Sequence, residues 1–222
     1  MYGDLFLRTV DAVEAKMHVR VGTDDDIAVD EIWNENVYRL HPDHVKDRVV
    51  FDIGANSGAF SLWAAAAGAE KVYAYEPQPD NFAALQKNVD GYNVECINAA
   101  LSNFNGSGSI NGLDNGSGSG FLSSGGTIQV RNFKDEMLKA SDIAVLKIDI
   151  EGSEYNCFSS IESSDLSNVE KLVMEFHGPG MSTIDNTLSF DFGSMITKIA
   201  EWGHVDILGR PSIGGMIYGV RY

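Results

Sequence analysis

Acidic side chains stand at the ends of short apolar runs, where they could bind a polar ligand. VVFDIGANSGAF carries Asp52 beside Gly54 and Gly58, and YAYEP places Glu76 after the next apolar run. Glycines at such a turn admit unusual dihedral angles and leave backbone N–H groups accessible to a ligand. The sequence therefore predicts a nucleotide-type ligand at this turn.

The glycine spacing and the two acids narrow the choice of ligand. The pattern is G-x-x-x-G, whereas a nicotinamide dinucleotide favours G-x-G-x-x-G. Asp52 would repel a pyrophosphate but attract a cation, and Glu76 could accept both hydroxyls of a ribose. S-adenosylmethionine offers both a ribose and a positive charge. Two alternatives stay open: an NAD-dependent oxidoreductase, and a non-catalytic binding module that keeps the fold.

A second group of chemically active side chains lies in IDIEG and EFH. Glu175 and His177 alternate along a predicted strand, so they point to the same face of the sheet. A hydroxyl group that reacts as a nucleophile must lose its proton, and a histidine with an ordinary pKa of about 6.5 suits the role of the base. We expect His177, or failing that Asp149, to accept the proton. Glu151 could instead complement the dipole of the following helix.

Lys147 lies two residues before Asp149 and on the same strand face. We expect it to be a structural partner of the neighbouring carboxylates and not a catalytic group. Asp, Glu and His residues of this kind could also hold a divalent metal ion. No spacing in the sequence demands one, and we predict no metal site.

Strands that alternate with helices must position these side chains. Because the strands are apolar runs separated by helix-period segments, we predict a mostly parallel sheet with helices on both faces. The last two strands have no helix between them, which predicts an antiparallel edge. The predicted strands are residues 49–53, 71–75, 94–98, 143–150, 171–177, 204–208 and 214–220. One domain over residues 48–222 accounts for all of them.

Residues 1–47 form an N-terminal extension that we expect to pack on or cap this domain. Apolar residues at roughly helical spacing predict a helix near its start: Leu5, Val10, Val13 and Met17. Further along, Trp33, Asn34 and Tyr38 could close over the pocket, or this segment could form a helix packed on the sheet edge.

Residues 105–126 are unusually rich in Gly, Ser and Asn. Such a segment supplies little area to bury, so we predict a long surface loop with room for a short hairpin. The strand–helix alternation resumes directly after it, which argues against a domain linker. We expect this loop to shape the acceptor site.

The composition limits the possible partners. A formal charge of −16 and a pI near 4.5 would repel phosphate backbones, so we predict no nucleic-acid partner. A membrane span needs about 20 apolar residues in a row, and the sequence contains no such run. The first 20 residues do not resemble a signal or transit peptide. We therefore expect a cytoplasmic protein.

Five segments in order resemble the signatures of FkbM-type methyltransferases, a class I S-adenosylmethionine-dependent family. They are VVFDIGANSGAFS, VYAYEPQPDNFAALQKN, INAALSN, VLKIDIEGSE and LVMEFHG, and they span about residues 49–178. The resemblance implies an α/β fold: a Rossmann-like, doubly wound, mostly parallel seven-stranded sheet. It also implies S-adenosylmethionine as methyl donor and transfer to a hydroxyl of a sugar, lipid or natural-product-like acceptor, a small molecule or a glycan.

The resemblance also assigns roles to individual positions. Asp52, Gly54, Asn56 and Gly58 would line the methionine part of the cofactor, Glu76 would hold the ribose, and Asn98, Ala99 and Ala100 would border the adenine. Asp149 would face the reacting methyl group, with Glu151, Glu175 and His177 as further catalytic candidates. The glycine-serine segment departs from the family pattern, which leaves acceptor recognition least defined.

Overall fold

The computed structural model describes residues 2–112, 120–179 and 190–222. Its central sheet consists of β3 (Val49–Ile53), β4 (Lys71–Tyr75), β5 (Val94–Ile97), β10 (Ile143–Ile148), β11 (Val169–His177), β12 (Gly203–Arg210) and β13 (Gly214–Arg221). The spatial order is β12-β13-β11-β10-β3-β4-β5. The order of strands along the chain reverses between β3 and β10, and ligands of open α/β sheets bind at such a switch point.

Strand directions confirm the predicted sheet. Strands β5, β4, β3, β10 and β11 run parallel, whereas β13 is antiparallel to both β11 and β12. The chain turns back directly from β12 into β13, and such a short connection joins antiparallel neighbours. The fold is therefore the expected Rossmann-like, doubly wound α/β sheet of seven strands with an antiparallel C-terminal edge.

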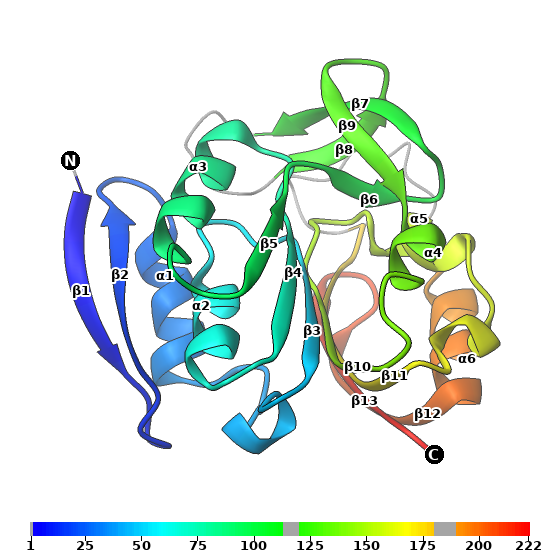
Figure 1. The fold of residues 1–222 in the computed structure, drawn as a ribbon. Coiled ribbons are helices and arrows are strands. Elements are labelled where there is room, and N and C mark those ends of the chain that lie inside the picture. Colours follow the sequence, from blue (N-terminus) through cyan, green and yellow to red (C-terminus); the bar gives the residue numbers. More distant parts are fainter. Residues whose placement is uncertain (1, 113–119, 180–189) are drawn as a thin grey trace.

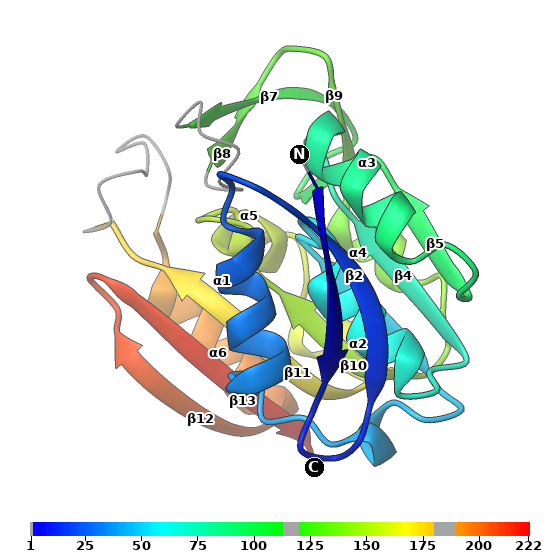
Figure 2. The same cartoon turned by 90° about the vertical axis from the view of Figure 1, so that its left-hand side faces the viewer.

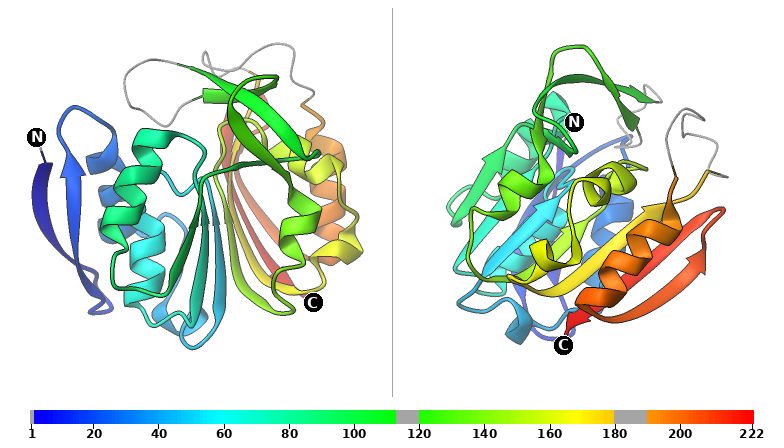
Figure 3. Two further views of the ribbon diagram at one scale, coloured as in Figure 1. Left: turned by 45° about the horizontal axis from the view of Figure 1, so that its top comes forward. Right: turned by 90° about the vertical axis from the view of Figure 1, so that its right-hand side faces the viewer.

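Helices cover both faces of the sheet (Figure 1). One face carries α2 (Ala59–Ala66) and α3 (Pro79–Asn88), and the other carries α4 (Phe133–Met137), α5 (Glu154–Ser159) and α6 (Phe192–Trp202). Figure 3 shows the sheet between these two layers. Every residue of β10 is buried, as expected for a central strand covered twice. Within the described residues, no helix has the length and apolar character needed to cross a membrane.

The N-terminal extension begins as a hairpin and not as the predicted helix. Strands β1 (Tyr2–Arg8) and β2 (Glu14–Arg20) pair antiparallel. Val13, Ala15 and Met17 are buried, whereas Ala12, Glu14 and Lys16 are exposed, so the true period is two. Short apolar patterns of this kind fit both periods, and packing decides between them. The buried face joins the hydrophobic cluster of α2 and α3. Figure 2 shows the hairpin from the side on which it lies over these helices.

After the hairpin, α1 (Asp25–Val29) continues into a π-helical turn, Asp30–Asn34. The indole N–H of Trp33 donates a hydrogen bond of 3.1 Å to the carbonyl of Ala59 in α2. The hydroxyl of Tyr218 in β13 donates to the carbonyl of Val37 at 2.7 Å. The extension is thus tied to both the helical layer and the sheet edge.

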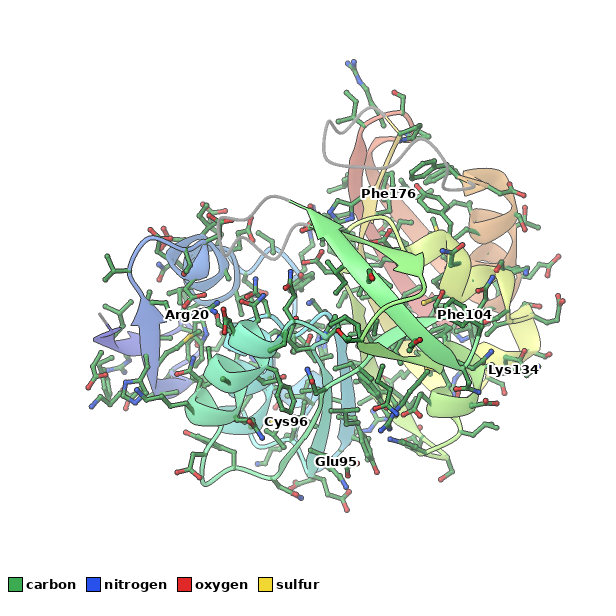
Figure 4. The ribbon with its side chains drawn as sticks, turned by 90° about the horizontal axis from the view of Figure 1, so that it is seen from above. Arg20, Glu95, Cys96, Phe104, Lys134 and Phe176 are labelled. Carbon is green, nitrogen blue, oxygen red and sulfur yellow. The ribbon has the colours of Figure 1, made fainter. Side chains whose placement is uncertain are left out.

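The glycine-serine segment contains two paired antiparallel strands in its described part, so the hairpin for which the prediction left room is present, with less loop than expected. A second sheet has the order β6-β9-β7-β8, formed by β6 (Ala100–Ser102), β7 (Gly106–Gly112), β8 (Gly120–Ser124) and β9 (Ile128–Asn132). Residues 113–119 lie outside the described part. Backbone pairing with the more apolar β9 makes these glycine-rich strands possible, because a ladder needs no large side chains. Figure 4, from above, shows this sheet crossing the carboxyl ends of the central strands.

Candidate functional site

A cleft opens at the carboxyl ends of β3, β4 and β10, and it has two adjoining parts. We call one the slot; among the residues that line it are Ile53, Tyr75, Glu76, Ala99, Ala100, Leu101, Ile110 and Ile150. We call the other the charged pocket; among the residues that line it are Ile27, Glu31, Tyr38, Lys147, Glu175 and His177. Gly54, Asn56, Asp149 and Glu151 line both. The volumes are about 630 and 990 Å³ including the open mouths, within the usual range for small-molecule sites.

The two glycines of the first turn are required by the protein itself. Gly54 and Gly58 have φ angles of +81° and +92°. A Cβ atom on Gly54 would lie 1.8 Å from the carbonyl oxygen of Asp149, and one on Gly58 would lie 2.8 Å from Cδ1 of Leu85. Gly58 lines neither part of the cleft. The absence of a side chain at these two positions therefore lets the turn contact the end of β10 and α3. Of the two glycines, only Gly54 also lines the cleft.

Asp52 lies beneath the turn and not in the wall of the cleft. It is fully buried, and its Oδ2 accepts a hydrogen bond of 2.6 Å from the hydroxyl of Ser61. The ammonium group of Lys147 lies 3.2 Å from Oδ1 and donates to the carbonyl of Gly54 at 2.6 Å. Lys147 thus pairs with a carboxylate, as expected. Because Lys147 compensates its charge, Asp52 supports the turn instead of attracting a cationic ligand.

Glu76 is held at the slot by backbone groups. Its Oε2 accepts from the N–H of Asn56 at 2.8 Å, and its Oε1 accepts from the N–H of Gln78 at 2.7 Å. Burial raises the pKa of Glu76 to about 7, although both backbone bonds act in the opposite direction. Each carboxylate oxygen keeps a second lone pair that a ligand hydroxyl can use.

The three residues predicted near an adenine take two different positions. Ala99 and Ala100 line the slot. Asn98 is exposed, and its amide donates to the carbonyls of Glu76 and Pro77 at 2.8 and 3.1 Å, so it fixes the loop that carries Glu76.

Sequence reasoning missed several walls of the slot. Leu101 and Ile150 directly follow residues that were predicted, so the same motifs could have indicated them. Ile110 reaches the slot from β7, in the segment predicted to be a loop. No local signal marks it, because its place depends on the pairing of the second sheet.

The four catalytic candidates are brought together in the charged pocket. Nε2 of His177 lies 3.3 Å from Oε2 of Glu151, 3.8 Å from Oε1 of Glu175 and 4.0 Å from Oδ1 of Asp149. The sequence did not indicate Glu154, whose Oε1 lies 3.0 Å from Nδ1 of the same ring. Glu154 is the last residue of the VLKIDIEGSE segment and is fully buried at the start of α5. No role was assigned to it, because the sequence does not show that its side chain reaches His177.

The carboxylates around His177 shift its protonation. Burial alone would lower the pKa of His177, but Glu154, and after it Asp149 and Glu151, raise it to about 10. Burial, followed by the charge of Asp149, raises the pKa of Glu151 and of Glu175 to about 7. The surrounding carboxylates therefore favour the protonated ring of His177, which makes it a less suitable proton acceptor than a carboxylate.

The N-terminal extension forms one wall of the charged pocket. The hydroxyl of Tyr38 lies 3.5 Å from Oδ2 of Asp149, and its ring packs edge-on against Phe60. Trp33 is buried beneath the wall, and the amide of Asn34 donates to Asp30 at an exposed position. Of the three residues considered for closing the pocket, only Tyr38 contacts it.

Strand order and cleft together define a methyltransferase-like α/β fold. A protein assigned as an rRNA methylase in Clostridium thermocellum matches it with a TM-score of 0.51 and 9% identity, over 92% of this chain and 100% of the other. A methyltransferase from Streptococcus mutans in complex with SAH matches with a TM-score of 0.50 and 10% identity, over 82% of this chain and 95% of the other. Identities this low establish the fold alone.

The model of the methyltransferase FkbM domain matches residues 52–205, more than half of the chain. The chain belongs to this family, and S-adenosylmethionine is its methyl donor. It is 25% identical to the hexuronic acid methyltransferase AglP of Haloferax volcanii over 200 residues, 82% of each chain. A shorter match of 66 residues at 42% identity links it to a protein N-terminal and lysine N-methyltransferase, efm7, of Neurospora crassa; it covers 27% of this chain and 23% of the relative.

The slot fits this cofactor. Glu76 faces it with free lone pairs, and Ala99 and Ala100 leave room beside an apolar wall. The side-chain oxygen of Asn56 is buried and has no hydrogen-bond partner among the described residues. A polar ligand at the junction of the two parts would provide one.

Proposed function

We propose that this methyltransferase transfers a methyl group to a hydroxyl oxygen of a sugar-type acceptor. The division of the cleft carries the proposal, because a narrow slot suited to a nucleoside adjoins a wider pocket lined by carboxylates and an imidazole. Asp149 lies at the boundary between them. The related hexuronic acid methyltransferase supports a sugar as the acceptor. Hydroxyl groups of lipids and of natural-product-like molecules are the other candidate acceptors.

In this proposal the slot positions the cofactor. Glu76 accepts hydrogen bonds from the two ribose hydroxyls, Ala99 and Ala100 lie beside the adenine, and Gly54 and Asn56 contact the methionine part. S-adenosylmethionine supplies, when bound, a methyl group activated by a positively charged sulfur. The chain itself then needs only to orient the acceptor and receive its proton.

Among the clustered acids, we assign proton acceptance to Glu175. The side chain of Glu175 is 39% exposed, compared with 27% for Asp149 and for Glu151. Unlike those two residues, Glu175 lines only the charged pocket and not the slot. An acceptor hydroxyl in that pocket can therefore reach it. Both ring nitrogens of His177 face carboxylates, so we do not assign proton acceptance to His177.

The test is methyl transfer from isotope-labelled S-adenosylmethionine to a panel of acceptors: free hexuronic acids, neutral hexoses, a glycolipid, an RNA oligonucleotide and a lysine peptide. We expect a methyl ether on a sugar hydroxyl, identified by NMR of the product. Methylation of the peptide amine alone, or of the RNA alone, would overturn the proposal. Cofactor binding without turnover on any hydroxyl would favour the non-catalytic module. Thermal stabilisation by NAD and not by S-adenosylmethionine would favour the oxidoreductase.

A further inference from the structure

We propose that Asp149, Glu151 and His177 form a binding site for one divalent cation of the Mg²⁺ or Mn²⁺ class, with Glu175 beside it. One ligand atom from each of the three lies within 4.8 Å of the others. The sequence spacing alone predicted no metal site, because the ligands come from the ends of two different strands. The parallel pairing of β10 with β11 brings them together.

The distances around His177 are longer than hydrogen bonds and leave space between the side chains for one cation. Nε2 is 3.3, 3.8 and 4.0 Å from the nearest oxygens of Glu151, Glu175 and Asp149. All three exceed the usual range of about 2.7–3.2 Å for an N–H···O hydrogen bond. Ligands bound at about 2.1 Å lie about 3.0 Å apart in an octahedron and about 3.4 Å apart in a tetrahedron. Glu151 is already at such a distance from Nε2, whereas Asp149, at 4.0 Å, would have to move closer by about 0.6–1.0 Å to share the cation.

Glu154 gives the site the outer support that metal-binding histidines require. Its Oε1 lies 3.0 Å from Nδ1 of His177, which leaves Nε2 directed into the cluster. The same oxygen accepts from the N–H groups of Ile150 and Gly152 at 3.1 and 3.2 Å, on either side of Glu151. One fully buried carboxylate thus fixes both the ring and the turn that carries Glu151. A carboxylate bonded to the second ring nitrogen is the common arrangement around metal-bound histidine.

The charge of the pocket also calls for a cation. Five acids line it, Asp24, Glu31, Asp149, Glu151 and Glu175, against Lys147 and His177. Lys147 already pairs with the buried Asp52 at 3.2 Å. A sugar carboxylate or a developing alkoxide would be repelled by this wall unless a bound cation offset it.

Carboxylate oxygens with a single imidazole favour Mn²⁺ or Mg²⁺ over softer metals. These cations prefer six ligands, so the three protein ligands leave positions for the acceptor, and Glu175 beside them stays free to receive its proton. This role rests on the proposed function. There the cation would bind the acceptor hydroxyl, lower its pKa and orient it toward the slot.

The test is titration of the EDTA-treated protein with Mn²⁺, followed by the EPR signal of the free ion, with Mg²⁺ and Zn²⁺ as competitors. We expect one bound Mn²⁺ per chain, displaced by millimolar Mg²⁺. Glu151→Gln should weaken binding at least tenfold, and Glu154→Gln should weaken it about 10- to 100-fold. Glu201→Gln, at an exposed position on α6, is the matched control and should bind as the native chain does.

Binding of S-adenosylmethionine by each variant checks that it is folded, and Glu151→Gln, at a half-buried position, carries the test if Glu154→Gln does not fold. The proposal is overturned if Mn²⁺ does not bind, if Glu151→Gln leaves its affinity unchanged, or if Zn²⁺ alone binds. The titration needs no acceptor. Hydroxyl methylation without Mn²⁺ or Mg²⁺ binding would therefore sink only the cation site, and Mn²⁺ binding without hydroxyl methylation would sink only the proposed function.

Discussion

The slot and the charged pocket are built in different ways although they share a boundary. Backbone groups and small residues define the slot: two N–H groups orient Glu76, and Ala99 and Ala100 leave space. Side chains from four segments define the charged pocket, including the N-terminal extension and the ends of β10 and β11. The slot therefore keeps its shape through backbone hydrogen bonds and small side chains. The charged pocket depends on contacts between distant parts of the chain, and its electrostatics can change through a single residue.

The largest expected effect separates chemistry in the charged pocket from cofactor binding in the slot. Glu175→Gln keeps the shape of the side chain but removes the proposed proton acceptor. We expect kcat to fall about 10²- to 10⁴-fold while the Kd for S-adenosylmethionine is unchanged. Initial rates and calorimetry measure the two quantities, with Glu201→Gln as control. A normal kcat in Glu175→Gln would exclude it as the proton acceptor.

The second prediction concerns the boundary between the two parts. Gly54→Ala would place a Cβ atom 1.8 Å from the carbonyl of Asp149, whereas at Gly22, with a similar φ of +84°, nothing lies within 4 Å. We expect Gly22→Ala to cost about 1 kcal/mol of unfolding free energy, from its dihedral alone. Gly54→Ala should cost about 3 kcal/mol or more. Denaturant unfolding of both variants measures the two losses of unfolding free energy, and their difference is the steric contribution. Equal losses would refute the close approach of Gly54 to the carbonyl of Asp149.

Removing the carboxylate of Glu76 from the slot should weaken cofactor binding and leave the rate of methyl transfer nearly unchanged. Glu76→Ala leaves the N–H groups of Asn56 and Gln78 without their acceptor and removes the proposed ribose contacts. We expect the Kd for S-adenosylmethionine to rise about 10- to 100-fold. At saturating cofactor, kcat should change little. Calorimetry checks this against Glu70→Ala, an exposed acid just before β4; an unchanged Kd would show that Glu76 does not hold the ribose.

The smallest expected effect is a pH dependence confined to the slot. Because the pKa of Glu76 is raised to about 7, the carboxylate loses its charge and a lone pair as the pH falls below that value. We expect cofactor affinity to weaken up to about tenfold between pH 8 and pH 6. Glu76→Gln should flatten this profile, measured by calorimetry at each pH. A native profile that is flat, or that runs the other way, would contradict the assignment.

The same group contributes to stability with the opposite sign. In the folded protein Glu76 binds a proton up to about pH 7, whereas its ordinary pKa is 4.5. The folded state therefore binds more protons than the unfolded state between these values. Its contribution to stability is present below pH 4.5 and is lost as the pH rises through this window.

The slot was predicted from the sequence more completely than the charged pocket. The sheet and the slot were largely predictable, because Gly54, Glu76 and Ala99 lie in short motifs at the ends of apolar runs. Of the acids in the charged pocket, Asp149, Glu151 and Glu175 were identified from their motifs, whereas Asp24 and Glu31 of the N-terminal extension were not. The raised pKa of His177 was not predicted either, since it depends on Glu154 from the start of α5. The hairpin of residues 2–20 was mistaken for a helix because its pattern fits two periods until packing selects one. Asp52 was placed in the wall because the sequence could not show Lys147 beside it.

The two connections between the second sheet and the rest of the domain lie next to each other. β6 and β9 lie side by side, and Asn132 fastens their junction: its amide donates to the carbonyl of Asn103 at 3.0 Å, and its N–H donates to Oδ1 of Asn105 at 2.8 Å. Within the residues that the structure describes, β7 and β8 beyond this junction make no strand pairing with the central sheet. Changes in the length or sequence of these two strands would therefore alter the cleft at Ile110 without breaking a pairing of the central strands.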